Sequence, residues 1–315
     1  MTKICRPSAP CNPHLCSCND NPPHYTYKMI HTDYSQTPIE YVHTQHARLA
    51  YRRMGVKQGT PIVFLNHLAA NMDGCDPKIM DGLARRFTVI CFDYPGIGLS
   101  QGKAATSVTA MAHDTIALIR ALGYTKVHLL GQSLGGFVAQ AILQIAPQLV
   151  ESAILAGTGP AGDKSLSRLP IVTFYDMLRG FLTGKDARYY LFFPPTAEAR
   201  RQANEFLTRI GQNRYKDKPT GLYAFLRQLK AVVAWGQAEA SNFSHIAHRV
   251  WVVNGSHDRM IPTSSSHLLA HRLPHSSLTI YEGAGHGAIF QEAELFVQQA
   301  TAFYTANDST INHIE

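Results

Sequence analysis

The sequence predicts an α/β fold: a mostly parallel open sheet with helices on both faces and a helical segment inserted into it. Two observations carry this prediction. From residue 61 to 157, and again from 249 to 306, short apolar runs rich in β-forming residues alternate with runs of helical periodicity. Between these stretches the alternation stops, and residues 160 to about 242 show helical patterns only. With 315 residues, 45% of them hydrophobic, the chain can build one large core with an inserted lobe.

The strands are expected at short apolar runs. Two strands joined by a tight turn at Gln45–His46 come first, at 39–44 and 47–54. Buried strands follow at 61–66, 87–93, 126–131, 150–157, 249–255 and 276–283. Because these later strands are apolar throughout rather than alternating, both of their faces should be covered by helices.

The helices are expected between these strands. Their predicted ranges are 76–86, 107–123, 134–147, 263–273 and 289–306. Ser107 or Thr106 is suited to cap the second of them, and Gly123 to end it. Inside the helical segment, breaks are expected at Gly184, Pro194–Pro195 and Lys218–Pro219.

The chain therefore divides into four predicted parts. They are a disordered N-terminal tail at 1–37, a core formed by 38–159 and 243–306, a helical cap at 160–242, and a frayed C-terminus at 307–315.

The tail holds four of the six cysteines. These four, with His14 and His24, are candidate ligands for a soft metal: Cys5, Cys11, Cys16 and Cys18. Their spacing lacks the paired C-x-x-C of most structural zinc sites, and five prolines lie in the first 23 residues, so we expect a solvated tail without metal. Only Cys75 and Cys91 lie in the body, which is therefore not a disulfide scaffold.

Composition argues against several other classes of protein. The net charge is +7, but no block of five or more like charges is present, which is poor support for nucleic-acid binding. No apolar run reaches the roughly 18–20 residues of a membrane span. The first thirty residues contain no apolar stretch typical of a secretory signal, so we expect a cytoplasmic protein with no membrane association. The oligomeric state is not visible in the sequence.

The most informative motif is LLGQSLGGFVAQ, residues 129–140. It places Ser133 between Gly131 and Gly135, directly after an apolar strand and directly before an apolar helix. This context is typical of the G-x-S-x-G elbow, in which a serine nucleophile sits on a strained strand-to-helix turn. The glycines let strand and helix approach closely. The same residues do not match a dinucleotide-binding or Walker motif.

A serine hydroxyl needs a base, and the base needs an acid that orients it. After such an elbow the chain order is serine, acid, histidine. Asp258 and His286 each follow a predicted strand, at the carboxyl edge where sites of open α/β sheets form. The alternative acid is Asp163, the first carboxylate after strand 150–157, whereas Asp93 precedes the serine and is expected to brace a glycine-rich turn.

Two backbone amides are expected to stabilise the tetrahedral intermediate. One belongs to Leu134, the residue after the nucleophile. The other comes from the loop LNHLAAN after strand 61–66, and we assign it to Leu68.

These residues resemble the α/β-hydrolase superfamily over about residues 38–306. The resemblance rests on the elbow, the DYPGIGLS turn, the helical insertion, the NGSHD loop and the GAGHG loop. Ser133, Asp258 and His286 fall on the matching motif positions. Most members carry His-Gly in the first oxyanion loop, whereas this chain has Asn66-His67-Leu68. That loop, followed by Asp76-Pro77, looks like the 3-oxoadipate enol-lactonase group.

The expected function is a cofactor-free, metal-free serine hydrolase that acts on a small carboxylic ester or lactone. Within the superfamily that this chain resembles, haloalkane dehalogenases and epoxide hydrolases carry aspartate at the elbow. The serine at this position therefore argues against both of these activities. C–C bond hydrolysis or cofactor-free peroxidation on the same triad is an alternative, and so is a non-catalytic ligand receptor. Residues 160–240 hold 13 Lys and Arg against 7 Asp and Glu, together with 12 of the 30 aromatics. This segment is therefore expected to line the pocket and to favour anionic substrates.

Overall fold

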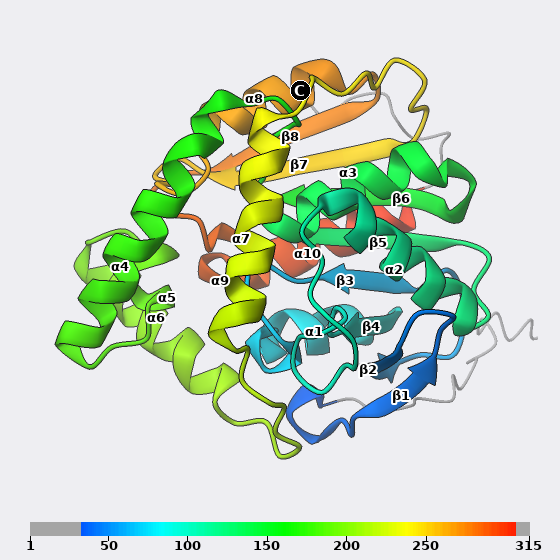
Figure 1. Cartoon of the computed structure of the whole chain (residues 1–315), viewed down its shortest axis with the longest axis horizontal. Coiled ribbons are helices and arrows are strands. Elements are labelled where there is room, and N and C mark those ends of the chain that lie inside the picture. The colour runs from blue at the N-terminus through cyan, green and yellow to red at the C-terminus, as the bar shows by residue number, and fades with distance from the viewer. Residues whose placement is uncertain (1–32, 307–315) are drawn as a thin grey trace, which may run out of the picture.

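The strands form one sheet in the order β1-β2-β4-β3-β5-β6-β7-β8 (Figure 1). The computed structural model describes residues 33–306. Its strands are β1 (Glu40–His43), β2 (Arg48–Gly55), β3 (Ile62–Leu65), β4 (Thr88–Phe92), β5 (Val127–Gln132), β6 (Val150–Ala156), β7 (Arg249–Gly255) and β8 (Ser276–Tyr281). β2 runs antiparallel to both of its neighbours, and all other neighbouring strands are parallel. The predicted mostly parallel sheet is confirmed, with strand bounds within two residues of those expected.

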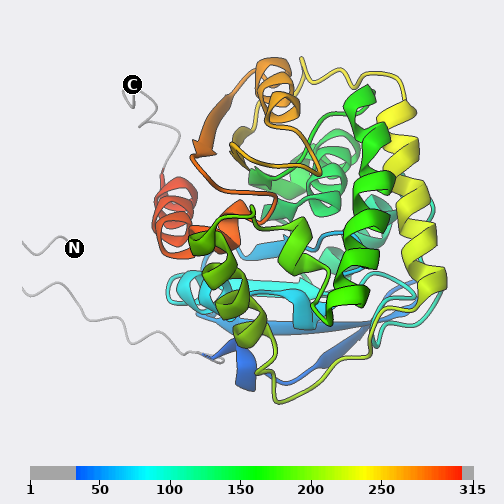
Figure 2. The same cartoon turned by 90° about the vertical axis from the view of Figure 1, so that its left-hand side faces the viewer.

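Helices cover both faces of this sheet. Those of the core are α1 (Pro77–Ala84), α2 (Val108–Ala121), α3 (Leu134–Ile145), α8 (Thr263–Arg272), α9 (Ala288–Gln291) and α10 (Ala293–Thr305). α2 packs beside α3 on one face, and α1 packs beside α10 on the other (Figures 1 and 2). Because both faces are covered, every residue of β3, β4 and β5 is buried, which explains why these strands are apolar without alternation.

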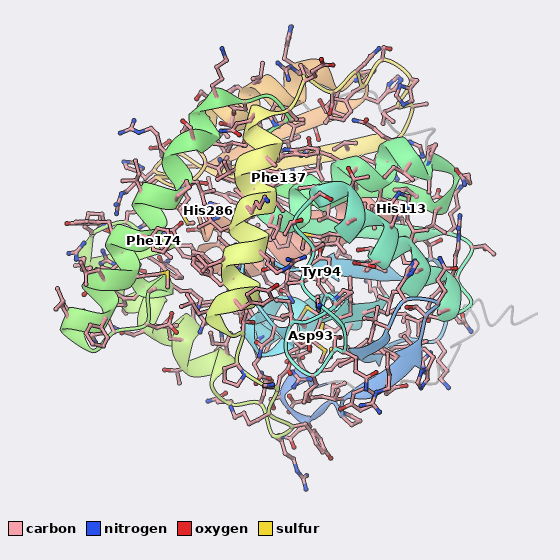
Figure 3. All side chains as sticks on the ribbon, in the orientation of Figure 1. Asp93, Tyr94, His113, Phe137, Phe174 and His286 are labelled. Atoms are coloured by element: carbon pink, nitrogen blue, oxygen red, sulfur yellow. The ribbon has the colours of Figure 1, made fainter. Side chains whose placement is uncertain are left out.

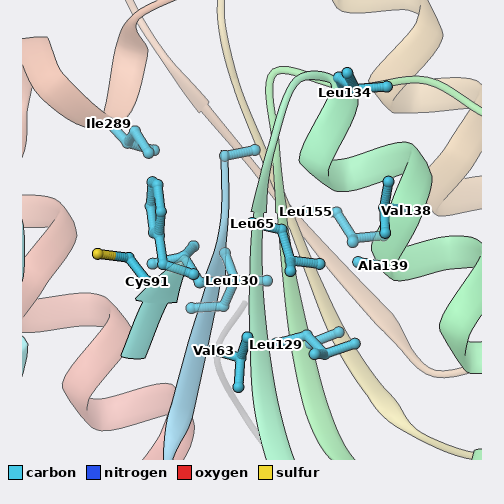
Figure 4. Close-up of a cluster of buried hydrophobic side chains, with 14 of the residues drawn as sticks. Val63, Leu65, Cys91, Leu129, Leu130, Leu134, Val138, Ala139, Leu155 and Ile289 are labelled. Carbon is cyan, nitrogen blue, oxygen red and sulfur yellow. The ribbon is translucent and has the colours of Figure 1, made fainter. Parts of the chain in front are cut away.

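The core lies between the sheet and these helices. Figure 4 shows Val138 of α3 next to Leu155 of β6, and Leu134 of α3 and Leu65 of β3 are, like these two, fully buried. Packing of α3 on the sheet therefore anchors the first turn of this helix, where the G-x-S-x-G motif lies.

The helix ends follow the expected local chemistry. Ser107 caps α2 by accepting a hydrogen bond from the Ala110 amide, and Gly123 adopts a φ of 81° just after its end. The predicted last helix at 289–306 is instead two helices, because Glu292 has φ −104° and ψ 39° and separates α9 from α10.

The segment between β6 and β7 is helical. It contains α4 (Leu169–Thr183), α5 (Arg188–Leu191), α6 (Ala197–Ile210) and α7 (Leu222–Gln237). Short 3₁₀ turns complete the structure at η1 (Tyr34–Gln36), η2 (Met72–Gly74), η3 (Pro147–Leu149) and η4 (Lys164–Arg168). Gly184 ends α4 in a left-handed conformation, and the other two breaks also fall where the prolines predict them.

The predicted tail boundary is wrong. Residues 33–37 are ordered, and Tyr34 is fully buried. Its hydroxyl donates to the Met72 carbonyl at 2.6 Å and lies 2.9 Å from Cys91 Sγ, while its amide donates to Asp81. Burial of this aromatic ring and satisfaction of its polar groups hold the segment against the core. Residues 1–32, with the four N-terminal cysteines, and residues 307–315 lie outside the described part of the chain.

None of the helices within residues 33–306 is long and apolar enough to cross a membrane. Within the same residues, no group of three or more histidine, cysteine or acidic side chains is arranged to hold a metal ion.

His128 is a buried titratable group, the second residue of β5. Its Nδ1 lies 2.8 Å from Ser152 Oγ, and its ring packs 4.7 Å from the ring of Tyr304. Burial disfavours the imidazolium and lowers the pKa of His128 to about 4. In the unfolded chain the ordinary histidine value of about 6.5 applies. Stability contributed by the neutral ring is therefore fully present above about pH 6.5 and is lost as the pH falls towards 4.

We expect His128→Gln to flatten the acid limb of the stability profile. In the natural protein, the unfolded chain binds a proton at His128 more readily than the folded chain does. As the pH falls from 7 to 4, this difference lowers the free energy of unfolding by up to about 3 kcal/mol. The measurement is urea unfolding followed by circular dichroism at half-unit pH steps. His113, which is exposed on α2, provides the matched control His113→Gln. A His128→Gln profile parallel to that of the natural protein would contradict this assignment.

Candidate active site

Ser133 occupies a strained turn between β5 and α3. Its φ is +56° and its ψ −117°, a combination that residues with a side chain rarely adopt. The turn is held by the Ser133 amide, which donates to the Ala156 carbonyl at 2.8 Å, and by Thr158 Oγ1, which donates to the Ser133 carbonyl. Ser133 is therefore fixed at the carboxyl edge of the sheet.

The glycines of the motif are required by close contacts. A Cβ on Gly135 would lie 1.9 Å from the Leu65 carbonyl oxygen of β3, and one on Gly131 would lie 2.5 Å from the Gly135 carbonyl oxygen. Both distances are far inside van der Waals contact, so no larger residue fits. The glycines thus allow α3 to start directly against the sheet.

The structure brings the three side chains proposed from the sequence into one hydrogen-bonded row. Ser133 Oγ lies 2.9 Å from His286 Nε2, and His286 Nδ1 lies 2.7 Å from Asp258 Oδ2. The three residues follow β5, β7 and β8, whose parallel carboxyl ends share one edge of the sheet. In Figure 3, His286 is seen between α4 and α7 of the inserted segment. All three side chains are buried.

Asp258 is itself held in place by the backbone. Its Oδ1 accepts hydrogen bonds from the Met260 amide at 2.8 Å and the Ile261 amide at 2.9 Å. Its Oδ2 therefore faces His286 Nδ1, which donates its proton to the carboxylate. This contact leaves the unprotonated Nε2 of a neutral ring to accept a hydrogen bond from the serine hydroxyl.

The two other carboxylates considered from the sequence lie elsewhere. Asp163 caps η4 by accepting from the Ser165 amide at 2.9 Å, and no hydrogen bond joins it to His286 within the described chain. Asp93 accepts from the Met72 amide at 2.9 Å and from the Leu99 amide at 3.3 Å. Asp93 therefore braces the glycine-rich turn, as expected.

The two amides expected to bind an oxyanion have no protein acceptor. Across residues 33–306, neither the Leu68 amide nor the Leu134 amide donates a hydrogen bond to another group. Leu134 is the first residue of α3, so its amide also lies at the positive end of a helix dipole. Both donors remain available to a ligand, which is the state an oxyanion hole requires.

The loop that carries Leu68 has a strained backbone, and a side chain of the inserted segment forms a hydrogen bond with it. Ala69 has a φ of +60°. Among the non-glycine residues at 33–306, only Ala69 and Ser133 have a positive φ. Its amide donates to Gln228 Oε1 of α7 at 2.8 Å, and Gln228 is fully buried. Sequence reasoning missed Gln228, although a glutamine in the apolar stripe of a helix is a signal that could have revealed it.

His67 lies beside this loop as a neutral side chain. Burial, helped by the charge of Arg188, lowers the pKa of His67 to about 3. Its Nδ1 lies 3.0 Å from the Leu68 carbonyl oxygen and must donate to it. The carbonyl of the strained Leu68–Ala69 peptide is thus held by His67, while the amide of the same peptide is held by Gln228.

The inserted segment also covers the histidine. The ring of Phe192 lies 5.5 Å from the ring of His286, and the Gly287 amide donates to the Phe192 carbonyl at 2.9 Å. As a result, Ser133 is only 4% exposed and His286 only 2% exposed. A surface pocket of about 310 Å³ opens elsewhere, between α2, α3 and α7, and none of the three side chains lines it.

Comparison with known proteins gives a consistent picture of the fold. A family model described as alpha/beta hydrolase fold matches residues 60–293. An alpha/beta hydrolase fold protein from Chitinophaga pinensis superposes with a TM-score of 0.83 at 32% identity, covering 87% of this chain and 100% of that one. The enol-lactonase from Burkholderia xenovorans LB400 superposes with a TM-score of 0.70 at 20% identity, over 85% and 100% of the two chains. A non-heme chloroperoxidase of Streptomyces lividans is 25% identical over 263 residues, which are 80% of this chain and 94% of that protein.

The strained backbone at Ser133 predicts an unusual order of stabilities. Ser133→Gly and Ser133→Ala both remove the hydrogen bond to His286, but only glycine adopts a φ of +56° without strain. We expect Ser133→Gly to unfold with a free energy about 1 kcal/mol higher than Ser133→Ala, measured by urea denaturation. Equal stabilities, or a less stable glycine variant, would show that the turn stores no strain.

Proposed function

Because this chain belongs to the α/β-hydrolase fold family, we propose that it is a serine hydrolase that cleaves a small carboxylic ester or lactone through an acyl-enzyme intermediate. The observation that carries this proposal is the hydrogen-bonded row from Asp258 through His286 to Ser133. The row contains a nucleophile, a base and a group that orients the base, at the distances that nucleophilic catalysis needs.

In the proposed reaction, Ser133 Oγ attacks the carbonyl carbon of the substrate while its proton passes to His286 Nε2. Asp258 stabilises the imidazolium that forms. The Leu68 and Leu134 amides donate to the oxygen that becomes negative, and His286 then protonates the leaving alkoxide. Water activated by His286 finally cleaves the acyl-enzyme and regenerates the serine.

Residues 160–242 act, in this proposal, as a lid over the reacting groups. The contacts of Phe192 with the histidine loop and of Gln228 with the oxyanion loop support this role. Ser133 is 4% exposed, and in this proposal the substrate reaches it when the inserted segment shifts away from the core. The aromatic side chain of Phe192 would then form part of the pocket wall.

A carboxylate on the substrate suits the charge of this region. The positive charge of Arg188 contributes to the lowered pKa of His67. Arg188 forms a 2.7 Å ion pair with Asp186. The net charge of +6 over residues 160–240 adds a longer-range attraction for anions. The enol-lactonase of similar fold makes a carboxylate-bearing enol-lactone one candidate substrate.

A second candidate is peroxidation on the same triad, favoured by the relative named as a non-heme chloroperoxidase. In that reaction Ser133 would first be acylated by a carboxylic acid, with loss of water. Hydrogen peroxide would then attack the acyl-enzyme, releasing a peracid and the free serine, and the peracid would oxidise a halide and return to the carboxylic acid. Halide oxidation by the natural protein, in the absence of any ester or lactone hydrolysis, would select this candidate.

We expect Ser133→Ala to lower kcat by several orders of magnitude while leaving the circular dichroism spectrum intact. The measurement is kcat/KM over a panel of short esters, lactones and enol-lactones, each with a free carboxylate or its methyl ester.

On the same panel, we expect substrates with a free carboxylate to have a higher kcat/KM than their methyl esters, and this preference to weaken between 20 and 500 mM salt. Near-normal turnover by folded Ser133→Ala, or no labelling of Ser133 by a fluorophosphonate, would contradict the proposal.

We expect Asp258→Asn to reduce kcat on the order of 10⁴-fold, because an amide no longer holds the histidine in the tautomer that accepts the serine proton. Asp163→Asn is the matched control, since Asp163 is buried but caps η4, and it should retain most of the activity. A mild effect at Asp258 together with a severe effect at Asp163 would reverse the assignment of the acid.

A further inference from the structure

Helix α4 turns an apolar face to the solvent. Six large apolar side chains on it are between 46% and 83% exposed: Ile171, Phe174, Tyr175, Leu178, Phe181 and Leu182. Their spacing of three, four, seven, ten and eleven residues places them along one side of the helix. This side is separate from the one that packs inward, where Leu169, Thr173 and Gly180 are buried.

The first turns of α7 extend this surface. Leu222, Tyr223 and Leu226 are also exposed, at 45% to 66%. Figures 1 and 2 both show α4 and α7 side by side, and the rings of Phe174 and Phe225 join the two helices at 5.9 Å. We call these nine side chains the α4–α7 apolar patch. Nine of the thirteen exposed large apolar side chains at 33–306 belong to it, so the concentration is local. Patches of this kind mark interaction surfaces.

Exposed cations flank the patch along the chain, and the exposed carboxylate of Asp186, which follows Lys185, is paired with Arg188 at 2.7 Å. Lys164 and Arg168 precede α4, Arg179 lies on it, Lys185 follows it and Lys230 lies on α7, and all five are exposed. The single acidic residue of α4, Asp176, is fully buried and faces Arg259 at 3.3 Å. The outer face of α4 therefore combines an apolar stripe with positive charge at both ends and carries no exposed carboxylate in the described helix.

From this combination we infer that the α4–α7 apolar patch docks on an anionic lipid surface. Apolar side chains in the middle of a helix enter the boundary between headgroups and acyl chains when the helix lies flat. Lysines and arginines at its ends then meet the negative headgroups, each contributing attraction that salt screens. A second copy of the chain fits less well, because both ends of α4 are cationic, so a two-fold pairing of this patch brings like charges of the two copies together in either orientation of the helices.

The inference is tested by sedimentation of the full chain with vesicles. We use phosphatidylcholine vesicles alone and vesicles that contain one third phosphatidylglycerol, at 50 and 500 mM salt. We expect binding to the anionic vesicles at low salt, at least tenfold weaker binding to the neutral ones, and a similar loss at high salt.

Variants assign the binding surface. Phe181→Glu combined with Leu182→Glu should weaken binding to anionic vesicles at least tenfold. Lys164→Gln combined with Lys230→Gln should weaken it and reduce its salt dependence. Leu295→Glu on α10 is the matched control, because Leu295 is 43% exposed but lies outside the patch, and it should bind as the natural protein does. Circular dichroism melting checks that each variant is folded.

Three results would overturn the inference. The first is no binding to anionic vesicles by the natural protein. The second is equal loss of binding in Leu295→Glu and in the patch variant. The third is a dimer in analytical ultracentrifugation that Phe181→Glu dissociates, without any binding of the natural protein to vesicles, which would identify a second copy as the occupant.

Discussion

The left-handed backbone of Ser133 is the constraint on which the rest of the site depends. With a φ of +56°, Ser133 places its hydroxyl 2.9 Å from His286 Nε2, and α3 begins at the next residue. That conformation persists only because Gly131 and Gly135 let the helix lie against β3 and β5 with no side chain between them. The Leu134 amide is left without a protein acceptor at the same turn, so this turn presents the two groups that we propose as the nucleophile and one oxyanion donor.

The other half of the site is assembled across the boundary between core and inserted segment. The Leu68–Ala69 peptide is held by His67 through its carbonyl and by Gln228 through its amide. His67 belongs to the same loop, whereas Gln228 is 159 residues further along the chain. A loop with a strained alanine keeps its shape when both polar groups of the peptide are satisfied in a buried setting. The position of α7 and the geometry of the loop that carries Leu68 are therefore physically linked.

The tertiary structure also decides which surfaces the positive charges of the inserted segment face. Arg188 lies close enough to lower the pKa of His67, but Lys164, Arg179, Lys185 and Lys230 are exposed around the outer apolar patch. A charge balance counted along the sequence cannot distinguish cations that face a substrate from those that face the surroundings. The same balance therefore supports two proposals at two different surfaces, one at the substrate and one at lipid.

The sequence by itself determined the order of strands and helices along the chain, the strand-to-helix turn at Ser133, and the three side chains that the structure brings into one hydrogen-bonded row. Those features depend on local periodicity, on glycines at a single turn, and on the rule that parallel strands end at one edge. It did not reveal that Tyr34 is buried, that Gln228 holds Ala69, or that α4 exposes its apolar face. Each of these depends on contacts between segments far apart in the chain. An apolar stripe has the same pattern whether it faces the core or the solvent, and only the packing of the folded chain decides between them.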